Sequence, residues 1–183
     1  MTSPATDLAG LLSSRIRDVP DYPKPGVLFK DIAPLLADAE AFAALTRALA
    51  ERATELGATK VVGLEARGFV LAAPAAFAAG LGFVPIRKKG KLPGEVHAQS
   101  YELEYGSATL EVQCDAFTPG ERVLVVDDVL ATGGTIGASL DLVRRAGARL
   151  AGVVVLMELG FLDGRARLAA HLDGAPLETL VRV

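Results

Sequence analysis

The sequence predicts an α/β protein with a mostly parallel central sheet flanked by helices. Short apolar runs rich in β-branched residues recur along the chain, which is typical of strands buried on both faces of a parallel sheet. Helical patterns lie between these runs, and such connections place helices on the faces of the sheet. The composition is 51% apolar and 22% charged, which indicates a single globular domain over residues 1–183.

The N-terminal part is expected to form two helices joined by an extended segment. Apolar residues at helical spacing predict a short amphipathic helix over 7–18. Three prolines over 20–25 then favour an extended chain that leads into the apolar stretch 27–32. Asp38 is expected to cap a second helix over 39–56.

Strands and helices alternate over the rest of the chain. Strands are expected over 60–64, 83–86, 123–126, 150–157 and 177–183. Helices are expected over 68–79, from the turn at 131–135 to about 146, and over 165–170. A polar loop over 87–100 precedes a β-hairpin, whose arms 101–104 and 108–113 flank Tyr105-Gly106-Ser107.

The stretch 122–137, RVLVVDDVLATGGTIG, carries the most specific chemistry. It reads as a buried strand that ends in Asp127 and Asp128, followed by a glycine-rich turn and a helix. Free backbone N–H groups and the helix dipole converge at such a turn, which therefore predicts an anion site. The residues of this predicted site are Ala131, Thr132, Gly133, Gly134 and Thr135.

The two aspartates are hard to explain as structure alone. Adjacent carboxylates at the end of a buried strand repel each other and lose solvation, so they need ligands. Sugar hydroxyls can donate hydrogen bonds to them, a metal ion is the other option, and an ordinary turn with solvated aspartates is the third. Carboxylates for a diol beside amides for a phosphate describe a pocket for ribose 5-phosphate.

Two groups of cations follow strand ends. Arg67 opens the helix after the strand 60–64, where a guanidinium suits a second phosphate group or is simply a surface residue. Arg87, Lys88 and Lys91 lie in the polar loop after the next strand. A run of this kind is most often a solvated surface, but a loop after a strand end opens on the ligand side of a parallel sheet.

These motifs resemble those of the type I phosphoribosyltransferases, and the resemblance covers the chain from about residue 15 onward. The sequences KLPG (91–94) and YELEYG (101–106) match the branch of that family that acts on adenine. The resemblance implies the type I phosphoribosyltransferase fold, with a small N-terminal hood mainly over 1–35 and a flexible β-hairpin loop. It also implies a cis peptide bond at Glu65-Ala66, where many relatives have Asp-Ser.

The activity implied by the resemblance is purine salvage, in which adenine and 5-phosphoribosyl 1-pyrophosphate give AMP and pyrophosphate. Asp127 and Asp128 would hold the ribose hydroxyls, and the turn 131–135 would hold the 5-phosphate. Mg²⁺, held mainly by substrate and water, would bridge the pyrophosphate to the ribose. The pyrophosphate itself would be bound by Arg67, Arg87, Lys88 and Lys91.

The resemblance also assigns the base pocket and a catalytic group. Glu104 would be the carboxylate that meets the imidazole edge of the purine and takes its proton. Tyr105 would help the mobile loop to cover the ribose and exclude water. Phe29, unless it is plain core, would stack on adenine, while the backbone of Leu28 and Lys30 would read its Watson–Crick edge. Many relatives have arginine in place of Lys30.

Charge and composition limit the kinds of partner and the cellular compartment that the sequence predicts. A net charge of −3 argues against nucleic acid as the main partner, and the apolar stretch 68–83 reads as a buried helix and a strand instead of a membrane span. The single Cys114 and an N-terminus without a signal-peptide core predict a cytoplasmic protein. The family relationship implies a homodimer. Two alternatives remain: a phosphoribosyltransferase for another purine base, and a non-catalytic regulator that binds phosphoribosyl pyrophosphate. Such regulators usually carry a DNA-binding domain, and the roughly twenty residues up to Pro20 are few for one.

Overall fold

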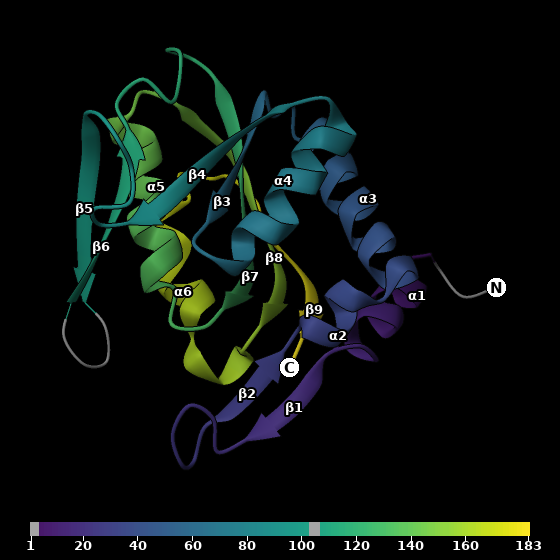
Figure 1. The fold of residues 1–183 in the computed structure, drawn as a ribbon. Helices are drawn as coiled ribbons and strands as arrows, with labels where there is room; N and C mark the ends of the chain where they lie inside the picture. The colour runs from purple at the N-terminus through teal and green to yellow at the C-terminus, as the bar shows by residue number, and fades with distance from the viewer. Residues whose placement is uncertain (1–3, 103–106) are drawn as a thin grey trace. The chain divides into compact units, whose positions relative to one another are not determined.

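The computed structural model of the protein describes residues 4–102 and 107–183 (Figure 1). These residues divide between two compact units, Met1–Ala48 and Leu49–Val183. The described part of the chain contains no helix that is both long enough and apolar enough to cross a membrane.

Among the described residues, the first unit contains a two-stranded antiparallel sheet, two helices and the N-terminal part of a third helix. Asp38 caps the third helix as predicted, because its Oδ1 accepts hydrogen bonds from the backbone N–H groups of Glu40 (3.1 Å) and Ala41 (3.0 Å). The second helix was not predicted; Pro34 is in its first turn, and the N–H of Ala33 donates to Asp31 Oδ1 (2.9 Å). The elements are α1 (Pro4–Ser13), β1 (Arg17–Pro20), β2 (Leu28–Asp31), α2 (Ala33–Ala37) and α3 (Ala39–Glu55), whose C-terminal part belongs to the second unit.

The second unit is built on a seven-stranded sheet in the order β5-β6-β4-β3-β7-β8-β9. The five strands from β4 to β9 are parallel, and β5 and β6 form an antiparallel hairpin at one edge, which confirms the predicted mostly parallel sheet. Its strands are β3 (Lys60–Leu64), β4 (Gly82–Lys88), β5 (Val96–Glu102), β6 (Ser107–Gln113), β7 (Arg122–Leu130), β8 (Arg149–Glu158) and β9 (Leu177–Arg182). Its helices are α4 (Arg67–Ala79), α5 (Gly134–Arg145) and α6 (Gly164–Leu168), with short 3-10 turns at Gly160–Leu162 and Ala169–His171.

The connections reverse direction at the centre of this sheet. From β3 the chain passes through α4 to β4 on one side, and from β7 it passes through α5 to β8 on the other side. Because such crossovers are right-handed, α4 and α5 cover opposite faces of the sheet (Figure 1). The carboxyl ends of β3 and β7 therefore form the switch point at which parallel sheets bind ligands.

Several strands are longer than the sequence predicted. The loop expected over 87–100 is shorter, because β4 continues to Lys88 through pairing with Leu110 of β6, and β5 begins at Val96 opposite Gln113. Pairing with β8 extends β7 beyond Val126 as far as Leu130. On its other side, β7 pairs with β3 only up to Val126, so the ladder opens on that side beside the two aspartates.

Candidate active site

A cavity of about 470 Å³ lies at this switch point. Its wall combines the segment after β3, the end of β7, the turn before α5 and the inner face of the hairpin. The lining residues predicted from the sequence are Arg67, Lys88, Asp127, Asp128, Ala131, Thr132, Gly133, Gly134 and Thr135. The others are Glu65, Ala66, Tyr101, Ala108, Leu110, Val129 and Ile136.

Asp127 and Asp128 are buried, with 8% and 4% of their surface exposed. Burial raises the pKa of Asp127 well above its ordinary value, and the charge of Asp128 raises it further. Burial also raises the pKa of Asp128, against the opposing effect of the Arg67 guanidinium. The two acids thus lie where their charged forms are poorly solvated, and a ligand that donates hydrogen bonds would stabilise those forms.

One oxygen of this pair accepts no hydrogen bond from the described residues. Asp127 Oδ1 accepts the backbone N–H of Asp128 at 2.9 Å. Asp128 Oδ2 is buried and accepts no hydrogen bond from the described residues, although Arg67 Nε lies 2.8 Å away in an ion pair that lacks hydrogen-bond geometry. A buried carboxylate oxygen of this kind is suited to a sugar hydroxyl or to a water molecule on a metal ion.

The glycine-rich turn is shaped by close backbone contacts. Gly133 has a φ of 85°, which favours glycine, and precedes the first residue of α5. A Cβ added at Gly133 would lie 2.9 Å from the carbonyl oxygen of Gly164, and one at Gly134 would lie 3.3 Å from the Tyr101 ring. Glycine at both positions therefore lets α6 and the hairpin approach the turn, whose first N–H groups have no partner within the helix.

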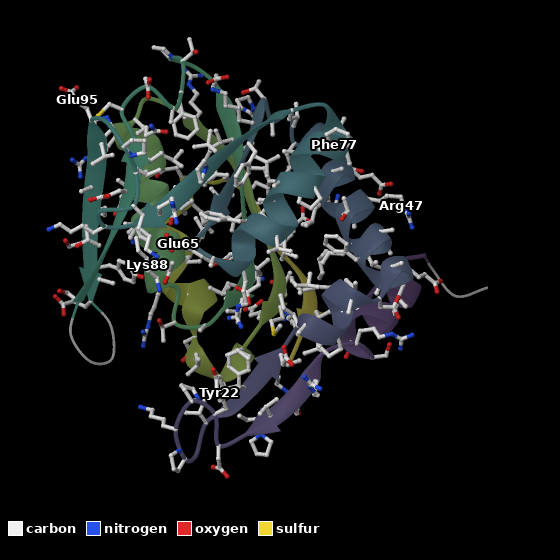
Figure 2. The ribbon with its side chains drawn as sticks, viewed as in Figure 1. Tyr22, Arg47, Glu65, Phe77, Lys88 and Glu95 are labelled. Atoms are coloured by element: carbon white, nitrogen blue, oxygen red, sulfur yellow. The ribbon has the colours of Figure 1, made fainter. Side chains whose placement is uncertain are left out.

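Glu65 organises the cations beside the cavity, a role that sequence reasoning missed. Its Oε1 accepts Lys91 Nζ (2.7 Å), and its Oε2 accepts the backbone N–H of Lys88 (2.8 Å) and Arg87 Nε (3.3 Å). Glu65 and Lys88 are labelled in Figure 2 and lie side by side. Although partial burial acts to raise its pKa, the hydrogen bonds from Lys91 and Lys88 and the charges of Lys91 and Arg87 lower the pKa of Glu65 below its ordinary value.

The predicted cations therefore occupy different positions. Arg67 and Lys88 line the cavity, whereas Arg87 and Lys91 lie behind Glu65 and do not line it. Gly90 of the same loop donates its N–H to the buried carboxylate of Glu111 (2.8 Å), which anchors the loop from the hairpin side. The peptide bond Glu65-Ala66 is cis, as the resemblance implied.

The predicted base-binding residues lie in β2 of the first unit. Phe29 packs edge-to-face against Tyr22, with ring centroids 5.1 Å apart, and both residues line a cavity of about 300 Å³. Leu28 is 53% exposed, and Lys30 Nζ is paired with Asp18 Oδ1 at 2.7 Å. The two remaining predicted residues, Glu104 and Tyr105, lie outside the described part of the chain.

Comparisons with known proteins agree with the fold and the cavity. A model of the phosphoribosyl transferase domain matches residues 34–173. An adenine phosphoribosyltransferase of Streptomyces coelicolor (strain ATCC BAA-471 / A3(2) / M145) is 69% identical over 183 residues, which is 100% of both chains. The crystal structure of adenine phosphoribosyltransferase from Rhodothermus marinus DSM 4252 is 48% identical with a TM-score of 0.89, and the match covers 97% of this chain and 99% of that one.

A third relative was solved with ligands. Adenine phosphoribosyltransferase from Saccharomyces cerevisiae, complexed with D-2,5-dideoxy-2,5-imino-altritol 1,6-bisphosphate and adenine, is 40% identical with a TM-score of 0.88 over 96% of this chain and 99% of that one. The fold and the matches together show that the chain belongs to the type I phosphoribosyltransferase family. Within this family it groups with the adenine phosphoribosyltransferases, the pentosyl-transferring enzymes of purine salvage, which confirms the resemblance found in the sequence.

Proposed function

We propose that the chain makes AMP and pyrophosphate from adenine and 5-phosphoribosyl 1-pyrophosphate, with the ribose 5-phosphate part bound in the cavity beside β7. The buried pair Asp127 and Asp128 carries this proposal, because Asp128 Oδ2 accepts no hydrogen bond from the described residues and has only the ion pair with Arg67. Ribose hydroxyls would donate to these carboxylates and replace the solvation lost on burial. The 5-phosphate would accept hydrogen bonds from the first N–H groups of α5 and from the hydroxyls of Thr132 and Thr135.

The pyrophosphate would lie against the cations that follow β3 and β4. Arg67 and Lys88 line the cavity and would contact it directly, while Lys91 and Arg87 would add positive charge from behind Glu65. These cations would stabilise the negative charge that builds on the leaving group as the glycosidic bond breaks. Because Glu65 pairs with Lys91 and Arg87, the positive charge of these two side chains would be in place before the substrate arrives.

Mg²⁺ fits these residues as an ion that arrives with the substrate. The described residues contain no group of three or more histidine, cysteine, aspartate or glutamate side chains placed to hold a metal. Glu65 is bound by Lys91 and the N–H of Lys88, so Asp127 and Asp128 are the acidic side chains on the wall that would accept its water ligands. When bound, the ion would neutralise charge on the pyrophosphate oxygens.

We assign adenine recognition to β2 and proton transfer to Glu104. Phe29 would stack on the base, and the backbone groups of Leu28 and Lys30 would distinguish the 6-amino group and N1 of adenine from the oxygen and N–H of hypoxanthine. The ion pair of Lys30 with Asp18 supports a backbone role for this residue, because its side chain is already bound. Glu104 would take or relay the proton that adenine loses when the N9 glycoside forms, and Tyr105 would help to exclude water.

We further propose a cytoplasmic homodimer that does not bind nucleic acid. Phe77 of α4, labelled in Figure 2, is 88% exposed. Val70 of the same helix is 44% exposed, and these two apolar side chains favour α4 as part of the subunit contact. The lone Cys114 is a free thiol, as expected for a reducing compartment. The net charge of −3 favours small-molecule substrates over nucleic acid.

Product analysis tests the function directly. Purified protein would be mixed with Mg²⁺, phosphoribosyl pyrophosphate and each of adenine, hypoxanthine, guanine and xanthine, and the nucleotide formed would be quantified. We expect AMP alone; another nucleotide would refute the adenine pocket, and binding without any product would indicate a regulator. The variant Glu104→Ala should lower kcat by about 10²-fold or more with little change in phosphoribosyl-pyrophosphate affinity.

A further inference from the structure

Tyr101 connects the hairpin to the glycine-rich turn. It lies near the end of β5, opposite Ala108 of β6. Its side chain lines the cavity of about 470 Å³ and also a second cavity of about 250 Å³ on the other side of the turn. Tyr101 therefore forms part of the wall between the two cavities.

Two contacts hold Tyr101 against the first turn of α5. Its hydroxyl lies 3.2 Å from Thr135 Oγ1, which donates to it in the structure. Its ring lies over Gly134, where an added Cβ would approach Cδ2 to 3.3 Å, closer than ordinary contact. The absence of a side chain at Gly134 thus brings the phenol hydroxyl within hydrogen-bonding range of Thr135.

The Thr135 hydroxyl has one proton to donate, and either the Tyr101 hydroxyl or a bound phosphate could accept it. When a phosphate occupies the turn, the Thr135 hydroxyl donates its proton to a phosphate oxygen and can no longer donate to Tyr101. The phenol can then rotate its own proton toward Thr135 Oγ1, which forms a chain from Tyr101 to Thr135 to phosphate. Hydrogen bonds in such a chain polarise one another, and the last of them is strengthened by the charge of the anion.

We infer that Tyr101 is a positioning residue for the 5-phosphate, which it reaches through the hydroxyl of Thr135. This inference rests on the proposed function, because it requires that the turn 131–135 binds phosphate. It adds a residue of the hairpin to the phosphate site and links that site to the strand that leads to Glu104. Removal of the phenol hydroxyl alone should weaken the binding of ligands that carry a phosphate and leave the binding of adenine unchanged.

The experiment is a double-mutant cycle read by AMP binding and by steady-state kinetics. Tyr101→Phe keeps the ring over Gly134 and removes only the hydroxyl. We expect a rise of about three- to tenfold in the AMP dissociation constant and in KM for phosphoribosyl pyrophosphate, with KM for adenine unchanged. In a Thr135→Val background the same substitution should have almost no further effect, because the chain is already broken.

A matched control exists on the same strand. Ser100→Ala also removes a hydroxyl from β5, but that hydroxyl bonds to Thr109 Oγ1 (2.9 Å) within the hairpin, so AMP affinity should not change. The role of Tyr101 would be refuted if Tyr101→Phe bound AMP with wild-type affinity. It would also be refuted if the effects of Tyr101→Phe and Thr135→Val were fully additive. Neither result would refute the phosphate assignment. Thr135→Val with wild-type AMP affinity would refute the phosphate assignment itself and the role of Tyr101 with it. Thermal unfolding of each variant would identify any loss that comes from misfolding.

Discussion

The contact between Gly164 and the glycine-rich turn allows a quantitative test of how the site is built. Gly164 is the first residue of α6, and it packs against the backbone where β7 enters the turn. A Cβ built there would lie 2.1 Å from the carbonyl oxygen of Ala131 and 3.0 Å from Leu130 Cδ1. We therefore consider the substitution Gly164→Ala, which adds one methyl group at a residue that does not line the cavity.

The size of the effect follows from these distances. To reach the 3.4 Å at which ordinary contact begins, the Ala131 oxygen and the new methyl must separate by about 1.3 Å, and a carbonyl oxygen cannot rotate away as a side chain can. Overpacking of this kind costs about 1–3 kcal/mol, which in a chain of this size lowers Tm by roughly 2–12 °C. A displacement of about 1 Å in groups that position a substrate can reduce the rate about 10²-fold. We expect KM for phosphoribosyl pyrophosphate to rise at least about tenfold, while KM for adenine changes little.

The assay combines thermal unfolding with KM for each substrate. Gly160→Ala is the matched control, because a Cβ at Gly160 meets only the oxygen of Val183 at 4.0 Å and should leave both measurements unchanged. If Gly164→Ala matched Gly160→Ala in Tm and in KM, the turn would tolerate displacement and the positional argument would be wrong. If Tm alone fell, Gly164 would support the fold but not the phosphate site.

Three further predictions concern buried or partly buried acids. Burial raises the pKa of Asp127, so its charge destabilises the fold above its unfolded pKa of about 3.9. Asp127→Asn should therefore raise Tm more at pH 7 than at pH 4, yet weaken phosphoribosyl-pyrophosphate binding by about tenfold or more. Glu65→Gln should raise KM for phosphoribosyl pyrophosphate by about three- to tenfold, because Lys91 and Arg87 lose the charge that holds them; a fall in KM would instead mean that Glu65 competes with the substrate. The hydrogen bonds that Glu158 accepts from Arg165, at 2.7 Å from Nη2, lower the pKa of Glu158, so its stabilisation is present above about pH 4.5 and is lost as the pH falls. Glu158→Gln should accordingly lower the free energy of unfolding by about 2 kcal/mol at pH 7, and denaturation at pH 3 should show a smaller difference.

The sequence predicted those parts of the molecule that depend on local pattern. The strand Lys60–Leu64 was predicted with its exact bounds, and the helix Ala39–Glu55 within one residue, because their apolar periodicity and the Asp38 cap lie within the segments themselves. The ends of β4, β5 and β7 were wrong, since pairing with distant strands sets them. The anion turn and the aspartate pair were visible because their residue types are unusual beside a buried strand.

The parts of the site that the sequence did not predict depend on contacts between distant segments. Glu65 lies 22 to 26 positions from the cations it binds, and Tyr101 lies 34 from Thr135, so neither pairing leaves a local pattern. Considered alone, a negative residue beside a proposed pyrophosphate site has the wrong charge to bind an anion. The structure resolves this conflict, because the Glu65 carboxylate binds two cationic side chains and a backbone N–H, and the summed charge of these groups remains positive.

This arrangement explains why acidic and cationic side chains can lie together in and beside one small cavity. Cations on long side chains lose conformational freedom when they bind a ligand, and that loss weakens binding unless they are already ordered. Glu65 orders Lys91 and Arg87 in advance, and Glu111 orders the loop between them through Gly90. Asp127 and Asp128 are buried in the same cavity at a cost that Arg67 and the backbone N–H of Asp128 offset only in part, because the pKa of each acid remains raised. A molecule that is anionic at both ends and carries hydroxyls between them can bind the cations and the glycine-rich turn through its anionic groups and donate hydrogen bonds to the two aspartates. Inorganic phosphate alone would donate no such hydrogen bonds to the aspartates.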